Sequence, residues 1–589
     1  MSGARMVLEC LKREGVDTIF GLPGGAVLPI YDVLYDFEGL RHILVRQEAA
    51  AGHAAEGYAR TTGKVGVCLV TSGPGMTNVI TALADAYMDS VPLVCFSGQV
   101  PTSLIGNDAF QEADNVGLSR PCTKYNFLVK DVNDLATTIK EAFYIATTGR
   151  PGPVLVDIPK DVSMAKADFS YPSSVSIRGY NPTYEGNKWQ IKQAAEAITK
   201  AKKPILYVGG GVVFSGASQE LLELAEMTQI PVDMTLMGLG AFPGEHPLSM
   251  GMMGMHGTYQ ANMAVHYSDL VIAVGARFDD RVTGKVSEFC PYAKIIHIDI
   301  DPTSIRKNIN VDIPIVGDCK TVLREMNQIL RATVNGEQKE LRKPWWDQIR
   351  EWQQAHPLTY QQEKDGPIKP QLVVKRLYEL TKDRDPIVST DVGQHQMWAA
   401  QYFKLAKPNR WLTSGGLGTM GFGFPAAMGA QAAFRDRLVL CIAGDGSIQM
   451  NMQEMATAVV SKLPVKIIIL NNRFHGMVRQ WQDLFYEGRY ASSYLDTTPD
   501  FVKLAEAYGA VGLRANKVGE LDGVLKEAIA TDKPVIVDVP TYPYENCYPM
   551  IPAGGCNHEM ILEDPPELKK KQSQAGAVTP EEKDTVLTA

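Results

Sequence analysis

Two polar motifs that follow apolar strands carry the most specific chemistry in this sequence. Gly444-Asp445-Gly446-Ser447 follows the apolar run 438–443, and Asn471-Asn472 follows the apolar run 465–470. A glycine turn between a strand and a helix directs backbone N–H groups and the positive end of the helix dipole at one point, which suits a phosphate. Parallel strands end at one sheet edge, so the Asp445 carboxylate and an asparagine amide should meet there. Such oxygens suit Mg²⁺, so together the motifs predict a magnesium-diphosphate site, although each alone would be only a turn or a strand end.

Three α/β blocks are predicted to position these motifs. In each block, short β-branched runs alternate with amphipathic stretches, a pattern typical of a parallel sheet with helices on both faces. The expected strands are 18–20, 64–71, 92–97 and 154–158 in the first block, 204–208, 270–274 and 295–300 in the second, and 387–390, 438–443, 465–470 and 535–539 in the third. The expected helices include 48–61, 76–87 and 189–201.

The first and third blocks repeat one pattern of strand, glycine turn, helix and strand. In the first block the turn is Ser72-Gly73-Pro74-Gly75, and in the third it is Ala443-Gly444-Asp445-Gly446. The repeat predicts two copies of one fold with different loops, with chance similarity between α/β units as the alternative. We expect domains at 1–165, 186–345 and 368–545, linkers at 163–187 and 331–368 with a helix around 345–354, and a C-terminal segment at 546–589 that ends in a disordered tail from residue 569.

Length and composition limit the class of protein. The chain has 589 residues, 45% of them hydrophobic and 21% charged, and a formal net charge of −8. These values exclude a disordered or coiled-coil chain and give no general attraction to nucleic acid or an anionic membrane. No apolar run approaches the ~18–20 residues that span a bilayer, and the start lacks the apolar core of a signal peptide. Nine scattered cysteines without a Cys-x-x-Cys pair indicate neither disulfides nor zinc. We therefore expect a cytoplasmic multidomain enzyme.

The Gly-Asp-Gly and Asn-Asn motifs resemble the signature of thiamine-diphosphate enzymes, and the resemblance narrows to the acetohydroxyacid synthase (acetolactate synthase) family. It extends to about Gly555, and its most specific segments are 277–281 (Arg-Phe-Asp-Asp-Arg) and 477–481 (Met-Val-Arg-Gln-Trp). Further matching stretches are 20–26, 71–75, 99–101, 108–111, 149–154, 393–397, 415–420 and 550–555. The family implies an α/β fold of three doubly wound parallel-sheet domains. Two have the thiamine-diphosphate-binding fold, and the middle domain is Rossmann-like and binds FAD.

The resemblance also implies roles for residues of the first and third blocks. Glu48 takes the place of the glutamate that activates the cofactor, and Gln111 lies near the reacting carbon. Glu56, on the same predicted helix, is expected to be a solvated or paired carboxylate. The implied Mg²⁺ ligands are Asp445, Asn472 and the carbonyl of Phe474. The implied contacts of thiamine diphosphate are Glu48, Gln394, His395, Gly418, Met420 (which supports a bent cofactor), Gly444, Asp445, Gly446, Ser447, Asn472 and Met477.

Arg281 and Trp481 are placed by the resemblance at the second substrate. An arginine can hold a carboxylate with two hydrogen bonds, and a tryptophan can fill the space left by an ethyl group. From the residues alone, core packing is an equal alternative for Trp481, and a local ion pair with the neighbouring aspartates is an alternative for Arg281.

The middle block contains Gly209-Gly210-Gly211 after an apolar strand, but the run lacks the third glycine of the dinucleotide fingerprint. Only by resemblance to the family's flavin-binding domain is FAD expected there, in a structural role. The implied FAD contacts are Arg150, Gly209, Gly210, Gly211, Met255, His256, Gly275, Arg277, Asp279, Asp299 and Asp318.

The implied activity is the decarboxylation of pyruvate with transfer of the two-carbon unit to a second 2-keto acid. Pyruvate gives 2-acetolactate and 2-ketobutyrate gives 2-aceto-2-hydroxybutyrate, in the biosynthesis of branched-chain amino acids. The alternatives are an FAD-dependent pyruvate oxidase and a non-catalytic cofactor-binding or regulatory subunit. A homodimer or tetramer and a small regulatory subunit are the expected assemblies, with neither nucleic acid nor a membrane as partner.

Overall fold

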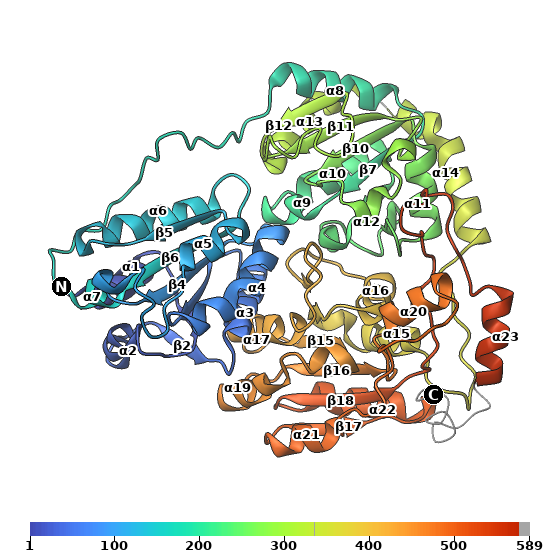
Figure 1. Cartoon of the computed structure of the whole chain (residues 1–589). Coiled ribbons are helices and arrows are strands. Elements are labelled where there is room, and N and C mark those ends of the chain that lie inside the picture. The colour runs from blue at the N-terminus through green and yellow to red at the C-terminus, as the bar shows by residue number, and fades with distance from the viewer. Residues whose placement is uncertain (335, 576–589) are drawn as a thin grey trace.

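Three six-stranded parallel sheets, with helices on both faces, form the computed structural model of the chain (Figure 1). The structure describes residues 1–334 and 336–575. The predicted α/β class with three doubly wound parallel-sheet domains is confirmed. The central strands are buried along their whole length, as expected for strands that are covered on both sides.

The N-terminal and C-terminal sheets have the same strand order. The N-terminal order is β2-β1-β3-β4-β6-β5, and the C-terminal order is β14-β13-β15-β16-β18-β17, which is the same permutation. The two domains are therefore copies of one fold, as the repeated pattern predicted. The N-terminal strands are β1 (Thr18–Gly21), β2 (Arg41–Leu44), β3 (Gly66–Val70), β4 (Leu93–Gln99), β5 (Tyr125–Leu128) and β6 (Pro153–Pro159). The C-terminal strands are β13 (Ile387–Thr390), β14 (Trp411–Leu412), β15 (Val439–Gly444), β16 (Lys466–Asn471), β17 (Val511–Arg514) and β18 (Val535–Pro540).

The middle sheet has a different order, β12-β11-β10-β7-β8-β9. If the six strands β7 to β12 are numbered 1 to 6 and the sheet is read from β9, the order is 3-2-1-4-5-6, which is typical of dinucleotide-binding folds. The chain reverses direction across the sheet between β7 and β10, so a ligand crevice is expected at their carboxyl ends. The strands are β7 (Pro204–Val208), β8 (Val232–Met234), β9 (Ser249–Met252), β10 (Leu270–Val274), β11 (Lys294–Asp299) and β12 (Ile313–Val316).

The helices alternate with these strands. The N-terminal domain has α1 (Gly3–Arg13), α2 (Leu28–Tyr35), α3 (Glu48–Thr62), α4 (Pro74–Asp89), α5 (Asn115–Ser119), α6 (Leu135–Thr147) and α7 (Lys160–Met164). The middle domain has α8 (Lys188–Lys200), α9 (Gly210–Phe214), α10 (Ser218–Thr228), α11 (Tyr259–Tyr267), α12 (Asp280–Thr283), α13 (Cys319–Thr333) and α14 (Glu337–Ala355). The rest of the described chain has α15 (Pro370–Thr381), α16 (Gln394–Tyr402), α17 (Gly423–Ala433), α18 (Asp445–Ile448), α19 (Met455–Val460), α20 (Gly476–Phe485), α21 (Phe501–Ala507), α22 (Val518–Ala530) and α23 (Pro566–Ala575).

The segment 331–368, expected to be a linker with a short helix, is instead largely helical. Helix α14 buries Trp345 and Trp346 against the middle domain, where their indole N–H groups donate to the carbonyls of Pro204 (3.2 Å) and Gln229 (2.9 Å). The charged residues on its exposed face hide this packing in the sequence. At the other end of the chain, α23 occupies the start of the predicted disordered tail, and the remainder, 576–589, lies outside the described residues.

Arg342 joins α14 to the C-terminal ends of two other helices. Its buried guanidinium donates to the carbonyls of Ile198, Ala201 and Thr228, which end α8 and α10. A cation suits these carbonyls because they lack partners within their helices and lie at the negative end of each dipole. Burial lowers the pKa of Arg342 to about 10, which still leaves it charged at neutral pH.

Arg342→Met is expected to lower the free energy of unfolding by about 3 kcal/mol, because three buried carbonyls lose a charged donor. Urea unfolding followed by tryptophan fluorescence measures the change. Lys343→Met, at the exposed neighbouring position of the same helix, is the control and is expected to stay within about 0.5 kcal/mol. Equal shifts for the two variants would show that the guanidinium contacts do not hold α14.

The N-terminal and C-terminal domains meet along α3 and α17, which lie side by side (Figure 1). A Cβ atom at Gly57 would overlap the carbonyl of Ala426, and one at Gly429 would overlap the carbonyl of Ala54. The two helix backbones are therefore in direct contact, and glycine at both positions is a condition of that approach.

Two other expectations concern the whole chain. The nine cysteines are free, and all except the partly exposed Cys122 are buried. Within the part of the chain that the structure describes, no helix combines the length and the apolar character that crossing a membrane requires.

Candidate functional site

Asp445 lies at the carboxyl edge of the C-terminal sheet, where β15 ends and α18 begins. Its side chain is 1% exposed, and its Oδ2 atom has no hydrogen-bond partner among the described residues. Burial raises the pKa of this carboxyl to about 7, although the backbone N–H groups of Arg473 and Gly446 act in the opposite direction. A buried carboxylate oxygen without a partner is the kind of atom that a bound cation satisfies. The site therefore fits the predicted Mg²⁺.

Asn472 and Gln394 meet beside this carboxylate. The Asn472 amide donates to Gln394 Oε1 at 3.3 Å, and its Oδ1 atom accepts the Phe474 N–H at 3.0 Å. A Cβ atom at Gly476 would overlap Gln394 Oε1, so this turn is packed tightly. Asn471 instead donates to Asp538 Oδ1 at 3.0 Å, which leaves Asn472 as the asparagine that faces the predicted diphosphate site.

His395 packs its ring against the glycine turn. A Cβ atom at Gly444 would lie 2.8 Å from His395 Nδ1, and the Ser447 hydroxyl accepts the Gly444 N–H at 3.1 Å. Burial lowers the pKa of His395 to about 3, so the imidazole is neutral, and its Nε2 atom has no partner among the described residues. A Cβ atom at Gly446 would come within 2.9 Å of His475. The structure thus brings together the predicted diphosphate and metal residues of the third block: Gln394, His395, Gly444, Asp445, Gly446, Ser447, Asn472 and Phe474.

Glu48 and Gln111 lie at the corresponding edge of the N-terminal sheet. Glu48 opens α3, is buried, and accepts the Asn78 amide N–H at 2.9 Å. A Cβ atom at Gly75 would lie 3.6 Å from Glu48 Oε1, and one at Gly73 would lie 2.6 Å from the Gln111 carbonyl. Gln111 has a positive φ of 57°, a strained conformation that is frequent at functional sites. The 72–75 turn therefore joins the two predicted catalytic residues of the first block.

Glu56 differs from Glu48 in its surroundings. It is buried, and its Oε1 atom lies 2.9 Å from His53 Nδ1, so the expectation of a paired carboxylate fits and that of a solvated one does not.

A cavity of about 1480 Å³ lies between the three domains. All eleven residues implied as FAD contacts line it: Arg150, Gly209, Gly210, Gly211, Met255, His256, Gly275, Arg277, Asp279, Asp299 and Asp318. Gly418, Met477, Arg281 and Trp481 also line it. A Cβ atom at Gly209 would overlap the carbonyl of Gly275, so the turns after β7 and β10 touch at the expected crevice. The volume exceeds the ~300–1,000 Å³ of common ligand pockets and suits a molecule as large as FAD.

Charged groups in the cavity wall suit a ligand with phosphates and hydroxyls. Arg277 lies 2.6 Å from Asp279 and also donates to the Met88 carbonyl at 3.1 Å. Arg150 Nε donates to Ser90 Oγ at 2.7 Å, and its Nη1 atom lies 3.3 Å from an oxygen of Asp301. His256 contributes no charge, because burial lowers its pKa to about 4.

Arg281 and Trp481 face each other across one end of the cavity. The guanidinium carbon of Arg281 lies 5.7 Å from the centre of the Trp481 ring, and its Nη1 atom lies 3.6 Å from Met255 Sδ. Among the described residues, the Arg281 side chain forms no ion pair with its neighbouring aspartates, which was the alternative. The Asp279 carboxylate pairs with Arg277 and accepts only the backbone N–H of Arg281. Trp481 is partly exposed at the cavity wall, so it is not a core residue.

The structure does not bring all predicted residues to this cavity. Glu48, Gln111, Met420 and the diphosphate residues are not part of its lining. Within one chain, Glu48 is therefore not among the residues that line the cavity with Trp481.

Several polar residues at these sites were given no role from the sequence, although Thr71 lies in the matching stretch 71–75. Thr71 Oγ1 is buried without a partner among the described residues, and Asn78 holds Glu48. Asp85 and Asp89, four residues apart, point from α4 to the loop that contains Gly418 and Met420. Their signal was present: two acids lie on the same helix face as the buried Ala82 and Ala86.

Three family models of the thiamine pyrophosphate (thiamine diphosphate) enzymes match the chain. The N-terminal TPP binding domain matches residues 1–118, the central domain 191–326, and the C-terminal TPP binding domain 391–539. Curated relatives match over nearly the full length. The chain is 52% identical over 567 residues to the acetolactate synthase isozyme 3 large subunit of Escherichia coli (strain K12), covering 95% of this chain and 98% of the relative.

Two further relatives are similar to the same extent. The acetolactate synthase large subunit of Haemophilus influenzae is 52% identical over 570 residues, covering 96% of this chain and 99% of the relative. The acetolactate synthase of Mycobacterium bovis is 51% identical over 565 residues, covering 95% and 91%. These similarities do not favour the pyruvate oxidase alternative.

Proposed function

Because the chain belongs to the acetolactate synthase family of thiamine pyrophosphate enzymes, we propose that it decarboxylates pyruvate and joins the remaining two-carbon unit to a second 2-keto acid. Two pyruvates then give 2-acetolactate and CO₂ without net oxidation, and pyruvate with 2-ketobutyrate gives 2-aceto-2-hydroxybutyrate. Both reactions belong to the biosynthesis of branched-chain amino acids. The observation that carries the proposal is the buried Asp445 carboxylate, with an oxygen that lacks a partner, beside Asn472 at the carboxyl edge of the third sheet.

In the proposed function, some residues bind the cofactor and its metal ion, and one transfers a proton. Asp445, Asn472 and the Phe474 carbonyl would hold Mg²⁺, and Gln394 with neutral His395 would orient the diphosphate. Thiamine diphosphate, when bound, supplies a ring that accepts the electron pair released when CO₂ leaves. Glu48, held by Asn78 in a buried position, is suited to take and return one proton at a carboxylate oxygen.

The cavity between the domains would hold FAD in a structural role, since the proposed reaction transfers no electrons to it. Arg150 and Arg277 suit its phosphates, and the carboxylates of Asp299 and Asp318 suit hydroxyl groups. At the end of the cavity, Arg281 would hold the carboxylate of the second keto acid and Trp481 would contact its alkyl group.

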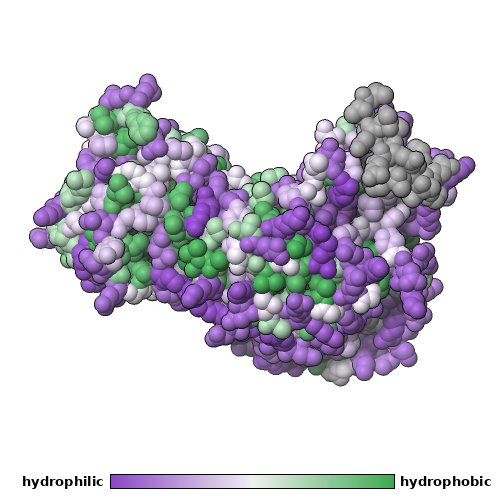
Figure 2. Space-filling view, turned by 90° about the horizontal axis from the view of Figure 1, so that it is seen from below, coloured by the Kyte–Doolittle hydropathy of each residue, from purple (hydrophilic) through white to green (hydrophobic). Residues whose placement is uncertain are grey.

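A homodimer is part of the proposal because Glu48 does not line the cavity that contains Trp481 in its own chain. A second copy could place its Glu48 at that cavity, which would make the partner chain necessary for catalysis. Apolar surface suited to such contact is present: Figure 2 shows green patches on the underside of both halves of the molecule. Phe110, next to Gln111, is 89% exposed.

Two further parts of the proposal concern the cellular context. The names of the Escherichia coli and Haemophilus influenzae relatives contain "large subunit", which supports a smaller regulatory partner for this chain as well. The free cysteines support a reducing location such as the cytoplasm.

Product analysis tests the proposed activity directly. The purified chain, supplied with Mg²⁺, thiamine diphosphate, FAD and pyruvate, is expected to form 2-acetolactate and one CO₂ per product molecule. Addition of 2-ketobutyrate is expected to give the second product in competition. Acetate formation coupled to anaerobic bleaching of the flavin, with no acetolactate, would instead indicate the oxidase.

Trp481→Leu is expected to reduce the preference for 2-ketobutyrate over pyruvate by about tenfold, because contacts to one methylene group are worth roughly 1–3 kcal/mol. The ratio of the two products at equal substrate concentrations measures the change. Trp189→Leu, on the exposed face of α8 and outside the cavity, is the matched control. An unchanged ratio in Trp481→Leu would remove this residue from the second-substrate pocket.

A further inference from the structure

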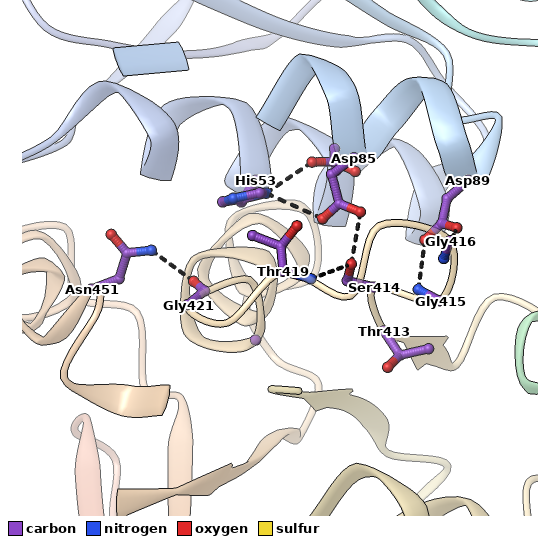
Figure 3. Close-up of polar contacts among 12 residues, drawn as sticks. His53, Asp85, Asp89, Thr413, Ser414, Gly415, Gly416, Thr419, Gly421 and Asn451 are labelled. Carbon is purple, nitrogen blue, oxygen red and sulfur yellow. Dashed lines mark hydrogen bonds and ion pairs between the residues drawn. The ribbon is translucent and has the colours of Figure 1, made fainter. Parts of the chain in front are cut away.

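Loop 413–421, which joins β14 to α17, is held by polar groups from another domain. Its residues 414–418 line the cavity, and it contains Gly418 and Met420, which are predicted to contact the cofactor. Two of the side chains that hold it, Asp85 and Asp89, come from α4 of the N-terminal domain, as Figure 3 shows. A loop at a binding site therefore depends on a helix that lies far from it in the sequence.

Asp85 and Asp89 make the contacts to this loop. Asp85 Oδ1 accepts the Ser414 hydroxyl at 2.7 Å, and Ser414 Oγ in turn accepts the Thr419 N–H at 2.8 Å. Asp89 accepts two backbone N–H groups, from Gly415 at 2.9 Å and from Gly416 at 2.7 Å. The three acceptor atoms fix the first turn of the loop, and the Ser414 hydroxyl connects that turn to its second half.

Further bonds show that the loop is held from several sides. Arg60, on α3, donates to the Thr413 carbonyl at 2.6 Å, and Asn451 donates to the Gly421 carbonyl at 2.7 Å. Asp89 is held in turn by Arg60, whose Nη1 atom lies 3.8 Å away. Asp85, Asp89 and Ser414 are all buried, so water does not compete for these bonds.

We propose that Asp85 and Asp89 are positioning residues, through which the N-terminal domain sets the conformation of loop 413–421 and so presents Gly418 and Met420 to the cofactor. The inference rests on the proposed function, because it takes these two residues as cofactor contacts. It adds a second role for the N-terminal domain, which besides carrying Glu48 shapes the cofactor site on the C-terminal domain of its own chain.

Variants of Asp85 can distinguish the effect of its hydrogen bond from the effect of its charge. Burial, together with the nearby carboxylates of Glu56 and Asp89, raises the pKa of Asp85 well above its usual range. A neutral Asp85 still offers Oδ1 to Ser414, and an asparagine amide keeps that oxygen. Asp85→Asn therefore preserves the bond, whereas Asp85→Leu, of similar shape, removes it. In Asp89→Asn, one oxygen remains for two N–H donors, and the new NH₂ group faces the other donor.

Two measurements on the full chain test the proposal. Hydrogen–deuterium exchange of peptides from loop 413–421 is followed in the cofactor-free protein, and thiamine diphosphate with Mg²⁺ is titrated by intrinsic fluorescence. In Asp85→Leu and Asp89→Asn, loop exchange and the dissociation constant of thiamine diphosphate are each expected to rise about tenfold, the effect of losing a hydrogen bond to a charged or buried group. Asp85→Asn should stay within about twofold of the wild type.

Ser97→Ala is the matched control, because Ser97 donates to the buried Asp157 at 2.6 Å within the N-terminal domain and away from the loop. Normal loop exchange and normal cofactor binding in both Asp85→Leu and Asp89→Asn would overturn the proposal, as would equal effects in Ser97→Ala. If Asp85→Leu does not fold, Ser414→Ala removes the same bond from the other side and carries the same expectations. Neither measurement uses turnover, so failure of the wild type to make acetolactate would count against the proposed function and leave the test of the loop intact.

Discussion

Asp445→Asn is expected to lower kcat/KM for pyruvate by more than about 100-fold, since even the outer partners of metal sites give 10–100-fold losses when they are changed. The asparagine keeps the size of the side chain but removes the charge. In the wild type, Asp445 Oδ2 at the carboxyl edge of β15 has no hydrogen-bond partner among the described residues. In the variant, the neutral amide at this position would no longer attract Mg²⁺. Without the cation, two negative phosphate groups would meet a site in which His395 is neutral. The loss should therefore appear in cofactor binding before it appears in chemistry.

Calorimetric titration of thiamine diphosphate at several Mg²⁺ concentrations measures this effect. The matched control is Asp157→Asn, at a buried acid within β6. Burial raises the pKa of Asp157 to about 6, and its carboxyl group accepts hydrogen bonds from Ser97, Gln99 and Asn115. This variant is expected to bind the cofactor normally, even if its stability falls. Normal Mg²⁺-dependent binding in Asp445→Asn would contradict the assignment of the metal site.

Glu48→Gln is expected to lower kcat by about 10²–10⁴-fold, the usual contribution of a positioned proton-transfer group, while thiamine diphosphate still binds. Glutamine keeps the length of the side chain and an oxygen for the Asn78 amide, but it cannot take up a proton. Steady-state acetolactate formation at saturating cofactor measures kcat, and calorimetry measures binding.

Glu56→Gln gives the comparison on the same helix. Its carboxylate contacts His53 and not the turn beside Gly75, so kcat should change far less than in Glu48→Gln. Equal losses in both variants would show that the effect comes from α3 as a whole and not from a proton at Glu48.

Glu48→Gln and Asp445→Asn, when combined, also test whether the active site is shared between chains. If each site combines Glu48 of one chain with Asp445 of another, a mixed dimer of Glu48→Gln and Asp445→Asn chains keeps one intact site. Random pairing then restores about a quarter of wild-type activity on co-expression. If both residues act within one chain, the mixture stays inactive.

Much of this architecture could be predicted from the sequence because buried strands leave a clear pattern. The strands Pro204–Val208, Leu270–Val274 and Ile387–Thr390 have the predicted bounds. The first two are continuous apolar runs, and all three are fully buried. The strands that were missed lie mainly toward the sheet edges: β5, for example, is Tyr-Asn-Phe-Leu and partly exposed, so it lacks that pattern. The length of helix α14 is greater than predicted because its many charged residues hide the apolar face that includes Trp345 and Ile349.

The site was predictable where chemistry is tied to a local motif. The Gly444–Ser447 turn and Asn472 could be found because they follow strong strands, and the structure brings them together. The contacts of Asp85 and Asp89 with the 413–421 loop join residues more than 300 positions apart. No spacing in one sequence encodes such a contact, because it exists only once the two thiamine domains are packed.

The backbone contact between α3 and α17 also limits how the molecule can move. A slide of either helix by one residue would bring a side chain to the place of Gly57 or Gly429, where no atom fits. This contact therefore opposes shear between the thiamine domains, and we expect the two domains to move as one block. Any opening that admits a substrate to the cavity must come from a hinge elsewhere, either of the middle domain against this block or of the partly exposed segment after α20. The contact between α3 and α17 thus directs motion to the end of the cavity that contains Arg281 and Trp481.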